Sequence, residues 1–148
     1  MQASRRISLV FCILAADAAF AEGSATAPQF NIAWQAYAAA AETRDPTRIH
    51  EAAENAYFAA EAQLTPSDSR YAAVALNYGE SLLAIGDSVR AREILAVAVD
   101  RFVSHSGPDA ADLIPVYLTA AQAHDDPAAG SDPTPYLDHA LAITALHH

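Results

Sequence analysis

The sequence contains no lysine, and its eight positively charged side chains, all arginines, stand against 18 aspartates and glutamates. The net charge of −10 argues against a nucleic-acid partner, because binding to phosphates requires a cluster of basic residues. A single cysteine can form neither an internal disulfide nor a cysteine-based zinc site. These absences exclude several classes of protein and leave the function open.

Glycine is also scarce, with five residues, whereas alanine fills 37 of the 148 positions. Alanine loses less free energy than any other residue on entering a helix, and runs of β-branched residues are few. The composition therefore predicts an all-α protein.

Residues 1–21 are predicted to be a cleaved secretory signal peptide. Arg5-Arg6 precedes an apolar run over residues 7–16, and Ala19-Phe20-Ala21 fits the small-x-small rule for signal peptidase. The alternative is a retained membrane anchor. A membrane span needs about 20 apolar residues, however, and this run is shorter and ends at Asp17.

Cleavage after residue 21 would change the mature chain in two ways. It would remove Cys12, leaving a thiol-free protein suited to an oxidising compartment. It would also remove two arginines and one aspartate, which changes the net charge from −10 to −11. We expect the mature protein in the bacterial periplasm or outside the cell, with no membrane span.

The rest of the chain repeats at an offset of 42 residues. Large apolar residues coincide at Trp34, Leu76 and Leu118, and alanines coincide at residues 56, 98 and 140. Self-similarity at a period of roughly 20 to 50 residues is typical of repeat architectures. After a lead-in over residues 22–27, we predict three helical hairpins within residues 28–148. They cover about 28–64, 66–105 and 108–147.

The middle hairpin has the clearest pattern. Its first helix, residues 70–85, carries apolar residues at helical spacing and polar residues off that face. The apolar set is Val74, Tyr78, Leu82 and Ile85, and the polar set is Asn77, Glu80 and Ser81. Gly86 supplies the left-handed residue that ends a helix, and Asp87 is the N-cap of the next helix, residues 88–103.

Similar capping residues and prolines mark the other helix boundaries. Asp45-Pro46 predicts an N-cap followed by proline at the first helical position, and Thr65-Pro66-Ser67-Asp68 predicts the start of the middle hairpin. Pro115 falls in the first turn of a helix that begins at Asp112, where proline is tolerated. Asp132-Pro133 opens the last helix. Six helices result.

The middle hairpin resembles the tetratricopeptide repeat. The residues that carry the resemblance, at the family's internal spacing, are Gly79, Gly86-Asp87, Ala91, Leu95 and Ala98. The 42-residue period, with a Ser-Gly-Pro-Asp linker at 106–109, is similar to the longer repeats of kinesin light chains and many bacterial proteins. The flanking copies depart from the pattern at Tyr37, Arg44, Ala128 and Pro133. The resemblance implies a right-handed α-solenoid that acts as a non-catalytic adaptor.

In this family the inner helices line a concave groove that binds a peptide or an extended segment of a partner. Carried over by position, the groove residues here are Asn31, Gln35, Glu42, Asn77, Glu80, Thr119, Gln122 and Asp126. This set is polar and mildly acidic and contains no basic residue, so it lacks the groups that clamp a partner's C-terminal carboxylate. We therefore expect a neutral or basic peptide partner. The alternative is that these residues are ordinary solvated helix faces.

A second hypothesis is a small-ligand-binding or accessory subunit of a periplasmic complex. It would use a closed pocket between the first and second hairpins, so the shape near Asn77 and Glu80 discriminates between the two. No catalytic residue, cofactor or metal site is predicted. The chain lacks the G-x-S-x-G motif, and the tryptophan and tyrosines follow the apolar stripes of the helices. The six histidines, at positions 50, 105, 124, 139, 147 and 148, do not form a metal-binding pattern.

The last helix has more apolar residues than one packed face requires. They are Tyr136, Leu137, Leu141, Ile143 and Leu146. Repeat arrays usually finish with a capping element whose outer face is polar. We therefore expect part of this helix to pack on a second copy of the chain or on a partner.

Overall fold

The computed structural model describes residues 27–125 and 131–147, and every regular element in these ranges is a helix. The helices are α2 (Pro28–Glu42), α3 (Pro46–Gln63), α4 (Ser69–Ala84), α5 (Ser88–Ser106), α6 (Leu113–Ala123) and α7 (Thr134–Leu146). The all-α prediction is confirmed for this part of the chain. The predicted signal peptide, residues 22–26 of the lead-in, Asp126 and Ala128 lie outside the described residues.

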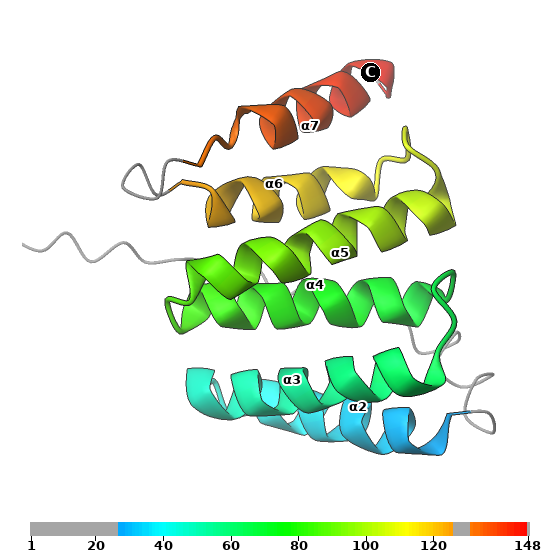
Figure 1. Cartoon of the computed structure of the whole chain (residues 1–148), viewed down its shortest axis with the longest axis vertical. Helices are drawn as coiled ribbons and strands as arrows, with labels where there is room; N and C mark the ends of the chain where they lie inside the picture. Colours follow the sequence, from blue (N-terminus) through cyan, green and yellow to red (C-terminus); the bar gives the residue numbers. More distant parts are fainter. Residues whose placement is uncertain (1–26, 126–130, 148) are drawn as a thin grey trace, which may run out of the picture.

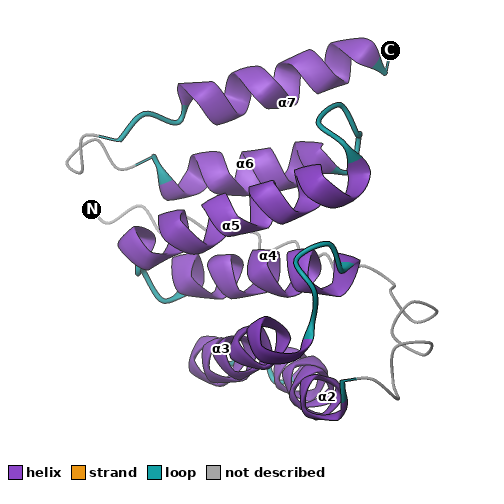
Figure 2. Cartoon of the chain, turned by 45° about the vertical axis from the view of Figure 1, so that its right-hand side comes forward, coloured by secondary structure: helices purple, strands orange, loops and turns teal. Residues whose placement is uncertain are grey.

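The six helices stack in chain order, from α2 and α3 at one end to α7 at the other (Figure 1). Each helix packs on the next one along the chain, and α4 also contacts α6. Figure 2 shows α2 and α3 almost end-on while α4 to α7 are seen from the side, so the first hairpin is turned relative to the others. None of the helices in residues 27–125 and 131–147 is long and apolar enough to span a membrane.

The predicted N-caps set the starts of three helices. The Asp45 carboxylate accepts hydrogen bonds from the backbone N–H groups of Thr47 and Arg48, at 3.0 and 3.4 Å. Asp68 and Asp87 cap α4 and α5 in the same way. These bonds satisfy N–H groups that have no partner inside the helix, which confirms the boundaries predicted from the sequence.

Two turns lie 42 residues apart and have the same unusual backbone conformation. Gly86, between α4 and α5, has a φ angle of 85°, as predicted. Arg44, between α2 and α3, has a φ angle of 56° although it carries a side chain. The repeat period therefore appears in the backbone as well as in the sequence, and Arg44 adopts a conformation that favours glycine.

Helix α4 lies at the centre of the stack and is buried on nearly every side. All residues from Arg70 to Gly79 are buried, as are Ser81 and Leu82. The prediction that Asn77 and Ser81 lie on a polar face was wrong, because α3, α5 and α6 all contact this helix. Ile85, predicted as an apolar-face residue, is 44% exposed because it stands at the C-cap, beyond the packed part of the helix.

The second hairpin closes tightly where α4 and α5 cross. A Cβ atom at Gly79 would lie 2.5 Å from both Cγ and Cδ2 of Leu95, so only glycine fits. Leu95 is fully buried, as are Ala91 and Ala98 on the same face of α5. Small residues on both helices thus allow the two backbones to approach closely.

The Arg44 conformation makes a testable prediction. Arg44→Gly should raise the free energy of unfolding by about 1 kcal/mol, because glycine removes the steric cost of a left-handed residue. Urea denaturation measures the change. The control is Glu51→Gly, at an exposed position inside α3, which should cost about 1 kcal/mol of helix propensity. Destabilisation of similar size in both variants would contradict the assigned turn.

The α4–α5 crossing makes a second prediction. Gly79→Ala should destabilise the protein by about 1 kcal/mol, because the overpacking cost of about 1–3 kcal/mol exceeds the gain in helix propensity. Chemical denaturation of Gly79→Ala, Leu95→Ala and the double variant would test this. In the Leu95→Ala background the added methyl group should stabilise instead. A stabilising effect of Gly79→Ala in the wild-type background would refute the close contact.

Candidate functional site

The residues assigned to the groove lie on three helices and differ in exposure. Gln35, Glu42 and Gln122 are exposed, Asn31, Glu80 and Thr119 are half-buried, and Asn77 is only 6% exposed. Asp126 is outside the described residues. Asn77 is therefore not accessible to a partner. The residues of this set that a partner could contact directly are those on α2 and α6. Their role in binding stays a prediction.

Glu80 is the unusual titratable group of this set. Its atom Oε2 is buried and has no hydrogen-bond partner. Burial alone raises the pKa of the Glu80 carboxyl to about 7, because the charged form loses its hydration. Tyr37 of α2 lies close enough to be affected: burial, and secondly the Glu80 charge, raises the pKa of its phenol. The half-buried Glu80 carboxyl of α4 is thus only partly ionised at neutral pH.

The described ion pairs do not neutralise Glu80. They join Arg48 to Asp45, Arg70 to Asp68, Arg90 to Glu54 and Arg101 to Asp100. Each of these four arginines therefore pairs with a carboxylate other than that of Glu80. This feature distinguishes Glu80 from Glu54, whose carboxylate has a basic neighbour.

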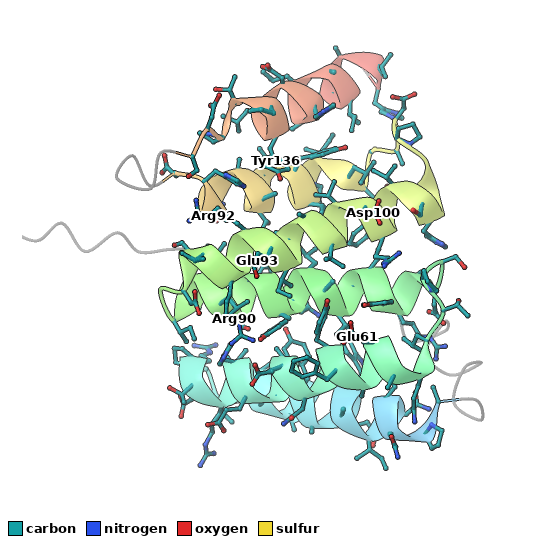
Figure 3. The ribbon with its side chains drawn as sticks, viewed as in Figure 1. Glu61, Arg90, Arg92, Glu93, Asp100 and Tyr136 are labelled. Carbon is teal, nitrogen blue, oxygen red and sulfur yellow. The ribbon has the colours of Figure 1, made fainter. Side chains whose placement is uncertain are left out.

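A polar network centred on Tyr78 connects α3, α4 and α5. The Tyr78 hydroxyl donates to Oε1 of Glu54 at 2.8 Å and accepts from the Arg90 guanidinium at 2.7 Å. Arg90 extends from α5 toward α3 (Figure 3) and also donates to Glu54 at 3.1 Å. The hydrogen bond from Tyr78, and then Arg90, lowers the pKa of Glu54. Burial, and then Glu54, raises the pKa of Tyr78 to about 12.

His50 and Ser81 extend this network, but their geometry does not form a catalytic pair. The Ser81 hydroxyl donates its proton to the backbone carbonyl of Tyr78 at 2.7 Å. Its oxygen must then accept from Nδ1 of His50, which lies 3.2 Å away. A histidine that donates to the hydroxyl cannot remove its proton as a general base. The contact therefore holds α3 against α4 and leaves the hydroxyl unactivated.

A second polar network connects the end of α3 and the start of α4 to the start of α2. Arg70, at the start of α4, makes two hydrogen bonds to the Asp68 carboxylate, at 3.0 and 2.7 Å. Its guanidinium lies 5.5 Å from the centre of the Phe30 ring. The side-chain oxygen of Gln63 accepts from the Phe30 backbone N–H at 3.0 Å. This network fixes the start of α2 against α3 and α4.

Sequence reasoning missed both networks. Tyr78 is buried, as its place on the apolar face predicted, but its hydrogen bonds to Glu54 and Arg90 were not predicted. Bonds between residues 24 and 12 positions apart in the chain have no local pattern in the sequence. The one signal in the sequence was that arginines are few, so each could be expected to have a specific partner. In the structure three of them lie over aromatic rings.

The apolar surface predicted on α7 is present in part. Leu137, Leu141 and Leu146 are 39%, 67% and 66% exposed. Ile143, named in the same set, is 3% exposed and lies on the face that joins the core, as expected if only part of the set remains uncovered. Tyr136 is half-buried, with its ring 6.4 Å from that of Tyr117.

The histidines of the described ranges make separate contacts. His139 stacks on Tyr117 at 5.1 Å, and Nε2 of His147 contacts the Asp109 carbonyl at 2.9 Å. In the described residues, no three His, Cys, Asp or Glu side chains gather closely enough to hold a metal ion.

Comparisons of the chain with family models, with curated proteins and with solved structures give no match.

The unpaired Glu80 carboxyl makes stability depend on pH in a defined direction. Its pKa in the folded state, about 7, exceeds the ordinary value of 4.5, so the folded protein holds the proton over that window. Stability should fall as the pH rises from about 4.5 to above 7. Glu80→Gln removes this effect, so its advantage over wild type should be about 1–3 kcal/mol larger at pH 8 than at pH 5.

Urea denaturation at the two pH values measures this difference. Glu93→Gln, at an exposed position of α5 (Figure 3), is the matched control and should show no such change between pH 5 and pH 8. If Glu80→Gln changed the free energy of unfolding equally at both pH values, burial would not disfavour the ionised Glu80 carboxyl, and the prediction would fail.

Proposed function

We propose that the chain is an exported, non-catalytic scaffold of the tetratricopeptide type. In this proposal its three hairpins form a right-handed α-solenoid, and the inner helices α2, α4 and α6 bind a neutral or basic peptide segment of a protein partner. The mature protein works in the periplasm or outside the cell after loss of residues 1–21.

The observation that carries the proposal is the packing of the second hairpin. Gly79, Ala91, Leu95 and Ala98 bear the resemblance in the sequence, and all four are buried where α4 meets α5. The positive φ angles at Arg44 and Gly86 repeat at the same 42-residue interval. Ala56, Ala98 and Ala140, also 42 residues apart, are each at most 4% exposed. These features support equivalent hairpins stacked as an array.

The charge of the inner positions supports the choice of ligand. The exposed members of the set are two amides and a carboxylate, Gln35, Gln122 and Glu42, and α6 carries no charged residue. Such a surface favours neutral or positively charged segments over acidic ones. The step from fold to peptide binding rests on the family resemblance, since a fold alone does not determine function.

The burial of Asn77 favours a second candidate function. Asn77 lies inside the protein, and the neighbouring Oε2 of Glu80 has no access to solvent. A small-ligand-binding or accessory subunit would need an enclosed site, and buried polar side chains of this kind are what would line one. A competition experiment distinguishes peptide binding from small-ligand binding. A small molecule that displaces a bound peptide would occupy the same site as the peptide. A protein that binds small molecules but no peptide would favour the second function.

Peptide arrays test the main proposal directly. The full mature chain should bind a subset of neutral and basic peptides. Glu42→Arg, at an exposed position of α2, and Glu80→Arg should each weaken this binding, and Glu80→Arg should lower the affinity for basic peptides at least about tenfold by charge reversal. Glu93→Arg on the exposed face of α5 is the control and should bind as wild type does.

Melting temperatures of all variants show whether each is folded. Unchanged peptide binding in both Glu42→Arg and Glu80→Arg would overturn the assignment of the inner surface.

A further inference from the structure

Glu80 has a carboxylate oxygen with an unmet hydrogen-bonding requirement. Oε2 is buried without a partner, although the residue as a whole is only half-buried. Leaving a buried polar atom without a hydrogen bond costs free energy, and a buried charge without a counter-ion costs more. The free protein therefore has a site on its inner helices that a suitable donor would stabilise.

The groups around α4 do not supply that donor. Tyr37 of α2 is coupled to Glu80, but a phenol brings no positive charge. On α3, Glu54 and His50 are bonded to Tyr78 and Ser81. The only titratable residue of α6 is Tyr117.

The arginines of α5 are engaged as well. Arg90 binds Glu54 and lies 5.8 Å from the centre of the Tyr78 ring. Arg101 lies 5.2 Å from the centre of the Tyr71 ring. Arg92 donates from Nε to the Ser88 carbonyl at 3.3 Å. Within the described residues, then, the side chain that would complete the Glu80 site has to come from a ligand.

The chemistry of the site favours an organic cation over a metal ion. A divalent cation such as Ca²⁺ takes six to eight oxygen ligands, and among residues 27–125 and 131–147 Glu80 is not part of any group of acidic or histidine side chains that could provide them. A lysine or arginine needs a single carboxylate. Its long aliphatic stem can pass along apolar surface and carry the charged end to a half-buried acceptor.

We propose that Glu80 is the residue that pairs with a lysine or arginine side chain of the bound segment, and that it thereby determines which segments bind. This inference deepens the proposed function and rests on it. The bound cation would donate a hydrogen bond to the carboxylate and balance its charge. It would thus supply the hydrogen bond and the counter-ion that Glu80 lacks in the free protein.

Pairing also couples binding to pH. The cation binds the ionised carboxylate, so any proton on Glu80 must leave as the segment binds. Because the pKa of Glu80 in the free protein is about 7, a large fraction of the protein must lose a proton at neutral pH. Lysine and arginine remain charged well above this range. Affinity should therefore increase from pH 6 to pH 8 and then level off.

The experiment uses a histidine-free peptide selected on the array, with its lysines or arginines replaced one at a time by norleucine or citrulline as the neutral counterparts. Isothermal titration calorimetry gives the Kd of each peptide for the mature chain, Glu80→Gln and the control Glu93→Gln, at pH 6 and pH 8. Wild type and Glu93→Gln should bind the cationic peptide about tenfold more tightly at pH 8. Glu80→Gln should show no such change, and one neutral replacement should abolish it in wild type.

The outcomes separate this inference from the proposed function. If peptides bind but no neutral replacement matters, or if Glu80→Gln keeps the pH dependence of wild type, the Glu80 assignment is wrong while peptide binding stands. If the array yields no bound peptide at all, both the proposed function and the Glu80 assignment fail.

Discussion

The burial of α4 is the constraint on which the rest of the structure depends. A helix packed on one side can leave its opposite face to water, but α4 contacts α3, α5 and α6 and has buried residues on every face. The absence of a side chain at Gly79 allows α5 to approach, with Leu95 filling the space that a Cβ would need. Polar groups on α4 must therefore find partners inside the protein or remain uncharged.

Arginine side chains provide partners for such buried groups at three places. Arg70, Arg90 and Arg101 each lie over an aromatic ring, those of Phe30, Tyr78 and Tyr71. Arg70 and Arg90 also pair with carboxylates. A guanidinium can contact a ring and a carboxylate together, so each of these two residues ties several helices. With no lysine in the chain, this use of arginine leaves Glu80 without a positive neighbour among the described residues.

The sequence predicted the features that local rules determine. Asp45, Asp68 and Asp87 cap helices because their side chains reach backbone N–H groups two or three residues away, and Gly86 ends α4 because it tolerates a positive φ angle. The faces of α4 could not be predicted in this way. Periodicity assigned Asn77 and Ser81 to a polar face, but packing against three helices overrides the pattern of one. The state of Glu80 likewise depends on which distant side chains reach it.

The rest of the account depends on Glu80, a half-buried carboxyl group of α4 that has no counter-ion among the described residues. The ¹³C chemical shift of the Glu80 side-chain carboxyl, followed by NMR from pH 4 to pH 9, measures its ionisation directly. In the free mature protein the account predicts a midpoint of about 7, caused by burial. A midpoint close to the ordinary value of 4.5 would show that Glu80 is solvated or paired, and would contradict the account.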